Sequence, residues 1–240
     1  MAQNVISKVL RKVLPLQSCG AVIVAAGNAS RMGGIDKVMA ELDGEPMILR
    51  TVRAFQENDV ISKIVIVTRE DLVAPIQELC KDFTKVCAVV VGGSNRQASV
   101  MAGLNALPKD VKLAAIHDGA RPLISATVID RTVRAAHTYG AAAPGVPVKD
   151  TIKVVAGGVV RETPDRSTLR AIQTPQVFDK DLLKAALVKA QQDGVEVTDD
   201  CGAVERMGMS VKIVEGDEKN LKVTTPLDLH IAQLILEGKL

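Results

Sequence analysis

The residues of this chain that could carry out chemistry are a set of cations and one carboxylate. The candidate cations are Arg31, Lys37, Arg121, Arg166 and Lys222, and the candidate ligand for Mg²⁺ is Asp118. Proteins commonly hold Mg²⁺ with one or two carboxylates and let water and phosphate oxygens complete the shell. The sequence shows no Ser-His-Asp or Cys-His arrangement typical of a nucleophile. The set therefore predicts transfer of a phosphoryl or nucleotidyl group.

The clearest candidate for a phosphate-binding loop lies in residues 21–41. An apolar run stops at Gly27, and a loop of small residues that carries Arg31 and Lys37 follows it. Small residues let backbone N–H groups approach an anion closely, and the two cations add charge. The loop is not a Walker A motif, and the chain contains no Gly-x-Gly for a dinucleotide fingerprint. Taken alone, the loop is better explained as an ordinary strand-to-helix turn.

Alternating strands and helices should position these residues. Apolar runs predict strands at 21–26, 61–68, 86–91, 111–116 and 141–148. Helical spacing predicts helices at 46–58, 70–82, 95–107 and 125–139. Strands that alternate with helices over short links indicate an α/β fold with a doubly wound, mostly parallel sheet of Rossmann-like type. The fifth strand contains Pro144 and Pro147, so we expect it to be irregular or to lie at an edge.

Polar loops follow four of these strands. They are residues 27–37, 92–99, 118–121 and 149–151. Ligands of doubly wound sheets bind outside the carboxyl ends of the strands, so the four loops should meet at one rim. Any one of them could be a turn, but together they favour a binding site. For Asp118 alone, capping of the turn before Pro122 is an equally good explanation, and Arg166 and Lys222 alone would be read as solvated charges.

The pattern changes after residue 150. Two short β-like runs flank Gly157 and Gly158, which predicts a β-arm over about 151–176 that projects from the sheet. Two helices at 181–192 and 199–207 and a strand at 211–214 should follow. The last helix should start at Thr225-Pro226, because Asp228 completes a capping pattern with Thr225.

Composition limits the function further. At 240 residues, we expect a single domain, with residues 1–18 as an N-terminal extension. A net charge of +2 and an aromatic content of 2% argue against a nucleic-acid partner. No apolar stretch approaches the roughly 20 residues of a membrane span. The four cysteines are scattered, which is typical of reduced thiols in a cytoplasmic protein.

Several motifs in order resemble those of the 2-C-methyl-D-erythritol 4-phosphate cytidylyltransferases, within the nucleotide-diphospho-sugar transferase class. The resemblance covers the chain from Gly20 to its C-terminus. Its most specific segments are 25–27 with 31–33, 92–99, 117–122, 148–151, 165–166, 173–176, 198–200 and 220–224. It implies an enzyme of the non-mevalonate isoprenoid pathway that couples CTP to the polyol phosphate and releases pyrophosphate.

The resemblance also implies a role for individual residues. The CTP pocket would be lined by Ala25, Ala26, Gly27, Gly93, Ser94 and Ser99. Asp118 would hold Mg²⁺ or another divalent cation, and Arg31 and Lys37 would stabilise the transition state. The polyol phosphate would be held by Arg121, Thr151, Arg166 and Lys222, of which Arg166 and Lys222 would also take part in catalysis by placing it for attack. Family members are homodimers through the arm, so Arg166 would reach the partner's site.

The chain departs from the family pattern mainly in the opening loop. Ala29 replaces the usual Gly, and Asp36-Lys37-Val38 replaces Pro-Lys-Gln. The altered loop supports one alternative, a catalytically silent nucleotide-binding protein on the same scaffold. A cytidylyltransferase for another polyol phosphate, such as ribitol 5-phosphate, is a second alternative, because it shares the fold and most motifs of the CTP pocket. The missing glycine fingerprint disfavours a dinucleotide-dependent dehydrogenase.

Overall fold

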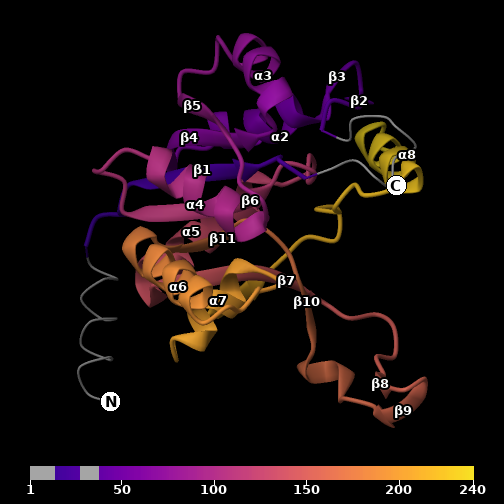
Figure 1. Ribbon diagram of the computed structural model, residues 1–240. Helices are drawn as coiled ribbons and strands as arrows, with labels where there is room; N and C mark the ends of the chain where they lie inside the picture. Colours follow the sequence, from indigo (N-terminus) through magenta and orange to yellow (C-terminus); the bar gives the residue numbers. More distant parts are fainter. Residues whose placement is uncertain (1–13, 28–37) are drawn as a thin grey trace.

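The computed structural model describes residues 14–27 and 38–240, and its centre is an eight-stranded sheet (Figure 1). Six strands lie in the order β5-β4-β1-β6-β11-β7, and β7 pairs with β11 and then β10 along one side and with β12 along the other. The strands are β1 (Cys19–Val24), β4 (Ile61–Thr68), β5 (Val86–Val91), β6 (Leu113–Asp118), β7 (Ala141–Pro147), β10 (Arg170–Ile172), β11 (Gln176–Asp179) and β12 (Lys212–Glu215). The predicted α/β fold with a mostly parallel sheet is confirmed.

The strands β1, β4, β5 and β6 form the parallel part of the sheet. Most of their side chains are aliphatic and buried, as expected for strands covered on both faces. The register places Val24, the last residue of β1, beside Asp118, the last residue of β6. The carboxyl ends of these strands therefore meet at one edge, where the predicted polar loops begin.

Helices cover both faces of the sheet. One face packs against α2 (Met47–Gln56), α3 (Val73–Leu79) and α5 (Ala126–Tyr139), and the other against α4 (Arg96–Ala106), α6 (Lys180–Gln192) and α7 (Asp200–Arg206). Apolar residues at helical spacing explain this packing: Met47, Ile48, Val52 and Phe55 of α2 are all buried. Single turns of 3₁₀-helix occupy Glu70–Leu72 and Arg166–Thr168. None of the described helices is long and apolar enough to cross a membrane.

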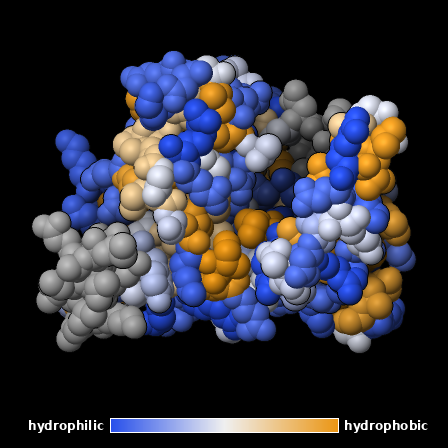
Figure 2. Space-filling model, turned by 90° about the horizontal axis from the view of Figure 1, so that it is seen from below, coloured by the Kyte–Doolittle hydropathy of each residue, from blue (hydrophilic) through white to orange (hydrophobic). Residues whose placement is uncertain are grey.

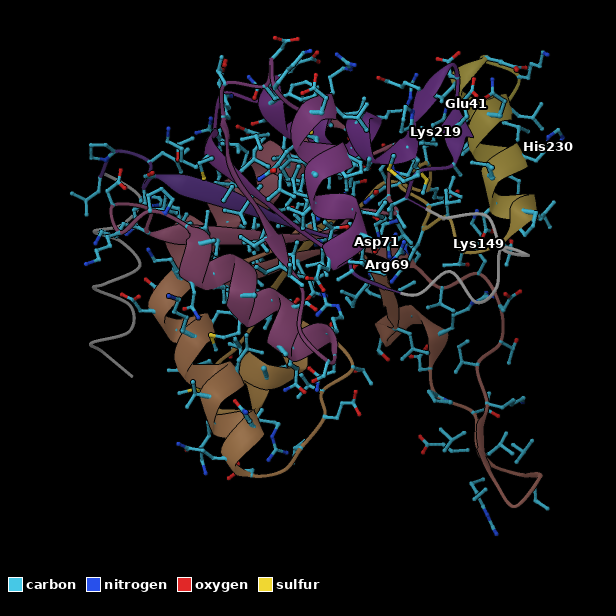
Figure 3. The ribbon with its side chains drawn as sticks, turned by 45° about the horizontal axis from the view of Figure 1, so that its top comes forward. Glu41, Arg69, Asp71, Lys149, Lys219 and His230 are labelled. Atoms are coloured by element: carbon cyan, nitrogen blue, oxygen red, sulfur yellow. The ribbon has the colours of Figure 1, made fainter. Side chains whose placement is uncertain are left out.

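A smaller apolar cluster joins α8 (Pro226–Leu236) to the short hairpin of β2 (Glu41–Leu42) and β3 (Glu45–Pro46). The predicted start of α8 is confirmed, since Thr225 and Asp228 form a reciprocal capping box. Glu41 of the hairpin and His230 of α8 lie on the same side of the molecule in Figure 3. This cluster also contains Ala120 and Val223, so it fixes the loop before α8 against the end of β6.

The structure differs from the sequence prediction around β7. Gly145 pairs with both Ile172 and Glu215, so β10 and β12 lie on opposite sides of β7, and β7 is not an edge strand. It is irregular instead, because its antiparallel neighbour changes from β11 to β10 around Pro144. The antiparallel strand β11 was not predicted. It inserts between β6 and β7, which brings its first residue, Gln176, to the carboxyl end of β6.

The predicted arm is present as a hairpin of β8 (Val154–Ala156) and β9 (Val159–Glu162) that extends from the body of the molecule (Figure 1). Lys149 lies at its base, is labelled in Figure 3, and pairs with Glu218 at 2.6 Å. The arm exposes Val155, Val159 and Val160 to more than half of their surface. In Figure 2, hydrophobic surface recurs on the part at the right, where the arm lies. Such valines are typical of a contact surface.

Candidate functional site

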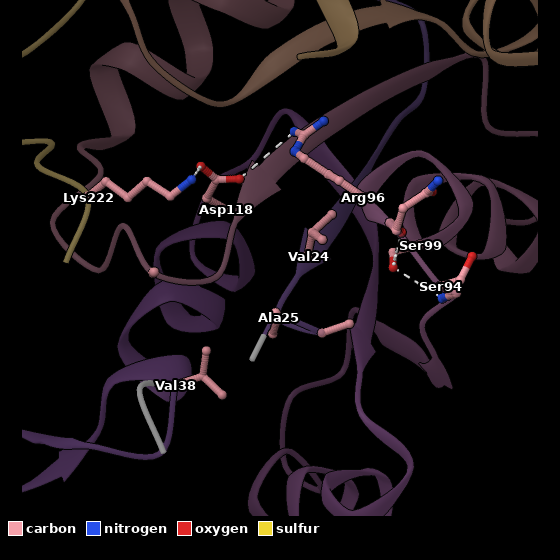
Figure 4. Close-up of a pocket in the computed structure, with 13 residues that line it drawn as sticks. Val24, Ala25, Val38, Ser94, Arg96, Ser99, Asp118 and Lys222 are labelled. Carbon is pink, nitrogen blue, oxygen red and sulfur yellow. Dashed lines mark hydrogen bonds and ion pairs between the residues drawn. The ribbon is translucent and has the colours of Figure 1, made fainter. Parts of the chain in front are cut away.

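A cavity of about 290 Å³ opens at the carboxyl ends of β1 and β6 (Figure 4). It is lined by Val24, Ala25, Ala26, Gly27, Val38, Gly93, Ser94, Asn95, Arg96, Ser99, Asp118, Ala120 and Lys222. These residues come from the loop after β1, the loop after β5, the end of β6 and the loop before α8. The rim predicted from the sequence is therefore a pocket in the described part of the chain.

The loop after β5 presents its backbone to the pocket. The Gly93 N–H donates to Ser99 Oγ at 3.1 Å, and the Ser99 hydroxyl donates to the Asn95 carbonyl at 2.9 Å. Asn95 also caps α4, because its Oδ1 accepts from the Ala98 N–H at 2.8 Å. Since its hydroxyl hydrogen is used inside the loop, Ser99 holds the loop in shape while lining the pocket.

The two glycines of this loop are required by close packing. A Cβ on Gly92 would lie 2.5 Å from Ala26 Cβ, and a Cβ on Gly93 would lie 2.3 Å from Ala98 Cβ. The first contact also shows that the loops after β1 and β5 touch. The Ala25 N–H donates to Val67 O at 2.7 Å, which fixes the loop after β1 to β4. Small residues thus bring two stretches of backbone to one wall, as an anion or a base edge requires.

The carboxylate of Asp118 is surrounded by cations. Its Oδ2 lies 2.8 Å from Lys222 Nζ and 3.7 Å from Arg121 Nε, and its Oδ1 lies 3.9 Å from Arg96 Nη2. Figure 4 shows Lys222 and Arg96 on either side of it. Burial opposes ionisation, but the three cations outweigh it and hold the pKa of Asp118 below its usual value. Asp118 is therefore a stable anion in a basic pocket.

A chain of hydrogen bonds fixes the end of β6. The Asp118 N–H donates to Thr174 Oγ1 at 3.1 Å, and the Thr174 hydroxyl lies 3.0 Å from His117 Nδ1. His117 Nε2 lies 3.2 Å from the Arg121 carbonyl, which can only accept, so we assign the proton to Nε2 and an acceptor role to Nδ1. His117 is fully buried, and burial lowers its pKa to about 4. It is thus a neutral, packed residue.

Arg121 belongs to the same network. Its Nη1 donates to the Asn220 carbonyl at 2.7 Å, and Asn220 Nδ2 donates to the Thr174 carbonyl at 2.9 Å. These bonds join the end of β6, the link before β11 and the loop before α8. The network thereby fixes the backbone segments that carry Asp118 and Lys222 relative to each other.

Sequence reasoning did not identify Arg96 or Asp200 as site residues. Asp200 is fully buried, and its Oδ2 pairs with Arg96 Nη2 at 2.8 Å. Burial raises the pKa of Asp200, and the charge of Arg96 offsets part of this effect. Both residues lie in segments that carry the family resemblance. Only the fold brings α4 and α7 together and reveals the ion pair.

The structure brings together eight of the predicted site residues at the pocket wall: Ala25, Ala26, Gly27, Gly93, Ser94, Ser99, Asp118 and Lys222. Arg121 contacts Asp118 from behind. Thr151 is exposed near the arm, and Arg166 lines a separate hollow with Lys149, where its Nη1 donates to the Lys149 carbonyl at 2.6 Å. The predicted residues Arg31 and Lys37 lie outside the described residues.

The described residues contain no group of three or more His, Cys, Asp or Glu side chains placed to hold a metal. A single ionised carboxylate at a phosphate-binding pocket nevertheless fits Mg²⁺, which takes most of its ligands from water and phosphate oxygens. Asp118 has this chemistry, because its pKa is low and it lines the pocket. It fits a cation that binds together with its phosphate ligand.

Known proteins resemble this chain over most of its length. The pattern of the family described as 2-C-methyl-D-erythritol 4-phosphate cytidylyltransferase matches residues 19–238. An enzyme of that name from Caldanaerobacter subterraneus subsp. tengcongensis is 47% identical over 221 residues, which cover 90% of this chain and 97% of that protein. Another from Desulforamulus reducens is 44% identical over 229 residues, covering 91% and 96%.

Solved structures show the same similarity. The 4-diphosphocytidyl-2C-methyl-D-erythritol synthase of Anaerococcus prevotii superposes with a TM-score of 0.84 at 30% identity, covering 92% of this chain and 96% of that one. The 2-C-methyl-D-erythritol 4-phosphate cytidylyltransferase of Thermus thermophilus has a TM-score of 0.76 at 30% identity, covering 92% and 100%. The chain therefore belongs to the 2-C-methyl-D-erythritol 4-phosphate cytidylyltransferase family.

Proposed function

We propose that this chain transfers the cytidylyl group of CTP to 2-C-methyl-D-erythritol 4-phosphate and releases pyrophosphate, as a step of non-mevalonate isoprenoid biosynthesis. Family membership over nearly the whole chain supports the reaction. The observation that carries it in the structure is the pocket itself, in which two small-residue loops face a carboxylate flanked by cations.

Backbone groups and the Ser99 side chain have different roles in the binding of CTP. Backbone groups of Ala25, Ala26, Gly27, Gly93 and Ser94 line the nucleotide, and Ser99 keeps the second loop in place. Backbone N–H and C=O groups at fixed positions can distinguish cytosine from the other bases, because each base edge carries its own order of donors and acceptors. Selectivity for CTP then depends on the shape of the loops more than on side chains.

Catalysis by this site is mainly positioning and charge stabilisation. The attacking group is a phosphate oxygen, which is already anionic and needs no strong general base. Lys222 and Arg121 hold the polyol phosphate for in-line attack at the α-phosphate of CTP. Arg31 and Lys37, together with the charge of Lys222, stabilise the charge that develops there. Pyrophosphate is the leaving group, so the bond made to the α-phosphate replaces the bond broken to the β-phosphate.

Asp118 holds the divalent cation, for which Mg²⁺ is the expected species. When bound, the cation neutralises charge on the triphosphate. The residues around Asp118 keep that carboxylate ionised and oriented, through Lys222 on one oxygen and the backbone bond to Thr174.

The arm supplies the remaining substrate contacts. Arg166 and Thr151 belong to it and do not line the pocket of their own chain. In a homodimer formed through the exposed valines of the arm, Arg166 reaches the pocket of the partner chain and helps to place the polyol phosphate. The chain then consists of one catalytic domain with an N-terminal extension over residues 1–18 and a dimerisation arm over about 151–176.

The test is an assay of pyrophosphate release. Purified protein and Mg²⁺ are combined with each nucleoside triphosphate in turn and with either 2-C-methyl-D-erythritol 4-phosphate or ribitol 5-phosphate. Release is expected only with CTP and the first acceptor. Release with ribitol 5-phosphate instead would identify another polyol-phosphate cytidylyltransferase, and no release with any pair would overturn the enzyme assignment.

A further inference from the structure

One nitrogen of Arg96 lies between two carboxylates. Arg96 Nη2 is 2.8 Å from Asp200 Oδ2 and 3.9 Å from Asp118 Oδ1. Asp118 lines the pocket, as Figure 4 shows, whereas Asp200 is fully buried behind it and does not line it. The two carboxylates therefore compete for one guanidinium, and the buried one holds it.

The carboxylate of Asp200 does not take part in the hydrogen bonds that fix the start of α7. Its backbone N–H and that of Cys201 both donate to Gln176 Oε1 at 3.1 Å, and Gln176 Nε2 donates to Asp199 Oδ2 at 2.8 Å. The start of α7 is thus fixed by Gln176 and by the side chain of Asp199, which accepts from the Gly202 N–H. Apart from the ion pair with Arg96, neither carboxylate oxygen of Asp200 has a hydrogen-bond partner among the described residues.

We propose that Asp200 is a positioning residue that holds Arg96 against the pocket wall and so keeps Oδ1 of Asp118 available to a divalent cation. The inference rests on the proposed function, in which Asp118 binds that cation. Lys222 and Arg121 already approach Oδ2. Pairing of Arg96 with Oδ1 would place cations against both oxygens of Asp118.

The physical reason is that a freed guanidinium pairs with the nearest anion. Arg96 Nη2 lies 3.9 Å from Asp118 Oδ1, so it has only about an ångström to move to reach hydrogen-bond distance. An Arg–carboxylate pair in a partly buried pocket is stronger than one in water. A cation then has to displace Arg96 before it can bind, which raises the concentration of Mg²⁺ that CTP binding requires.

The experiment measures CTP binding by calorimetry over a series of Mg²⁺ concentrations and extracts the Mg²⁺ concentration at half-maximal binding. Asp200→Asn should raise this midpoint about tenfold, the effect of one modest charge pair. A matched control is Asp130→Asn on α5, which removes the acid of the exposed Arg134–Asp130 pair (2.7 Å), neither residue of which lines the pocket. Its midpoint should equal that of the unchanged protein. Thermal unfolding checks that each variant is folded.

A double mutant tests whether Asp200 acts through Arg96. In the Arg96→Met background, Asp200→Asn should leave the Mg²⁺ midpoint unchanged, because no guanidinium remains to pair with Asp118. A merely structural role for Asp200 predicts the same loss in both backgrounds, and that result would overturn the inference. So would a midpoint within twofold of the unchanged protein in Asp200→Asn.

Two further variants keep the inference testable in every case. If Asp200→Asn does not fold, Asp200→Ser takes its place, since it also removes the charge that holds Arg96. Its midpoint should rise about tenfold, and a midpoint within twofold of the unchanged protein would refute the inference. Asp118→Asn separates the two proposals. It should raise the midpoint strongly, and if it does not, the metal role of Asp118 fails independently of Asp200.

Discussion

Lys222 Nζ lies 2.8 Å from Asp118 Oδ2, although Lys222 comes from the loop before α8 and Asp118 ends β6. The backbone around both residues is tied together through Arg121, Asn220 and Thr174. The ammonium is therefore held at the pocket wall, next to the carboxylate proposed to bind the cation. Its position is set by the fold rather than by chance contact of two surface charges.

Replacing Lys222 should reduce turnover far more than it reduces stability. We expect Lys222→Met to lower kcat at least a hundredfold, because a transition-state charge contact of roughly 3 kcal/mol is lost. Lys222→Arg should recover part of the activity. Lys219→Met, in the same loop but exposed, is the control and should behave like the unchanged protein. Steady-state kinetics measure both, and a change of less than threefold in Lys222→Met would contradict the role.

The buried His117 should make stability sensitive to mild acid. Its folded pKa of about 4 lies below the ordinary value of 6.5, so the unfolded chain binds a proton first as the pH falls. The free energy of unfolding should then decrease by about 1.4 kcal/mol per pH unit between pH 6.5 and 4. The lowered pKa of Asp118 places the loss from that carboxyl at more acidic pH.

Urea unfolding at several pH values from 7 to 4 measures this slope. His117→Gln can donate and accept hydrogen bonds but does not titrate, so its unfolding free energy should lack the extra slope. Parallel curves for the two proteins over this range would show that His117 does not cause the sensitivity.

A methyl group on Gly93 should disturb CTP binding selectively. Its Cβ would lie 2.3 Å from Ala98 Cβ and 3.0 Å from the Ala98 carbonyl carbon, so the loop must shift away from α4. We expect Gly93→Ala to raise the KM for CTP tenfold or more. Gly103→Ala is a matched control. Its Cβ would lie 2.3 Å from Val22 Cγ1, an equally close contact, but Gly103 is in α4 where the helix packs on β1. It should lower the melting temperature without a selective change in that KM.

Complementation between inactive chains tests the role of Arg166. If Arg166 acts in the partner's pocket, Arg166→Ala and Asp118→Asn should each be nearly inactive, yet mixing them by refolding should restore activity. Random pairing gives one intact pocket in each mixed dimer, so about a quarter of full activity is expected. Light scattering reports whether the mass is twice that of the 25.5 kDa chain. Recovery of no activity in a mixture shown to be dimeric would place Arg166 in its own chain's site.

Lys37 carries the prediction that depends most on the family resemblance. Lys37→Ala should lower turnover more than a hundredfold and leave the fold intact, because it removes a charge contact of roughly 3 kcal/mol from the transition state. Lys81→Ala at the end of α3 is an exposed control, whose partner is Glu78. Circular dichroism checks the fold, and near-normal kinetics in Lys37→Ala would assign the role to another cation.

The parallel part of the sheet could be predicted because its signals are local. Strands such as 61–68 are continuous aliphatic runs bounded by polar residues, and the structure places β4 at those positions. The meeting of the polar loops at one rim could also be predicted, since loops at the carboxyl ends of strands converge in a doubly wound sheet. The six CTP-binding residues that the family resemblance implied all lie in these converging loops and line one pocket.

The features that could not be predicted depend on pairing between distant segments. The strand β11 has only four residues, too few to show a period, and its place between β6 and β7 follows from tertiary contacts. The pairing of Arg96 with Asp200 likewise requires α4 and α7 to be adjacent. β6 runs on through His117 and Asp118 because the ladder with β1 continues to Val24, which no local pattern of polar residues reveals.

The arm leaves the sheet and returns to it at two paired residues of neighbouring strands. Pro147 and Arg170 are partners in the ladder between β7 and β10, so the chain returns to the sheet beside the point where it leaves. A two-residue turn can span such neighbouring strands. Apart from the residues proposed to contact the substrate, the arm can therefore change in length and sequence without any rearrangement of the sheet. A change in the arm would therefore alter the proposed contact with a partner chain and leave the backbone of the nucleotide pocket in place.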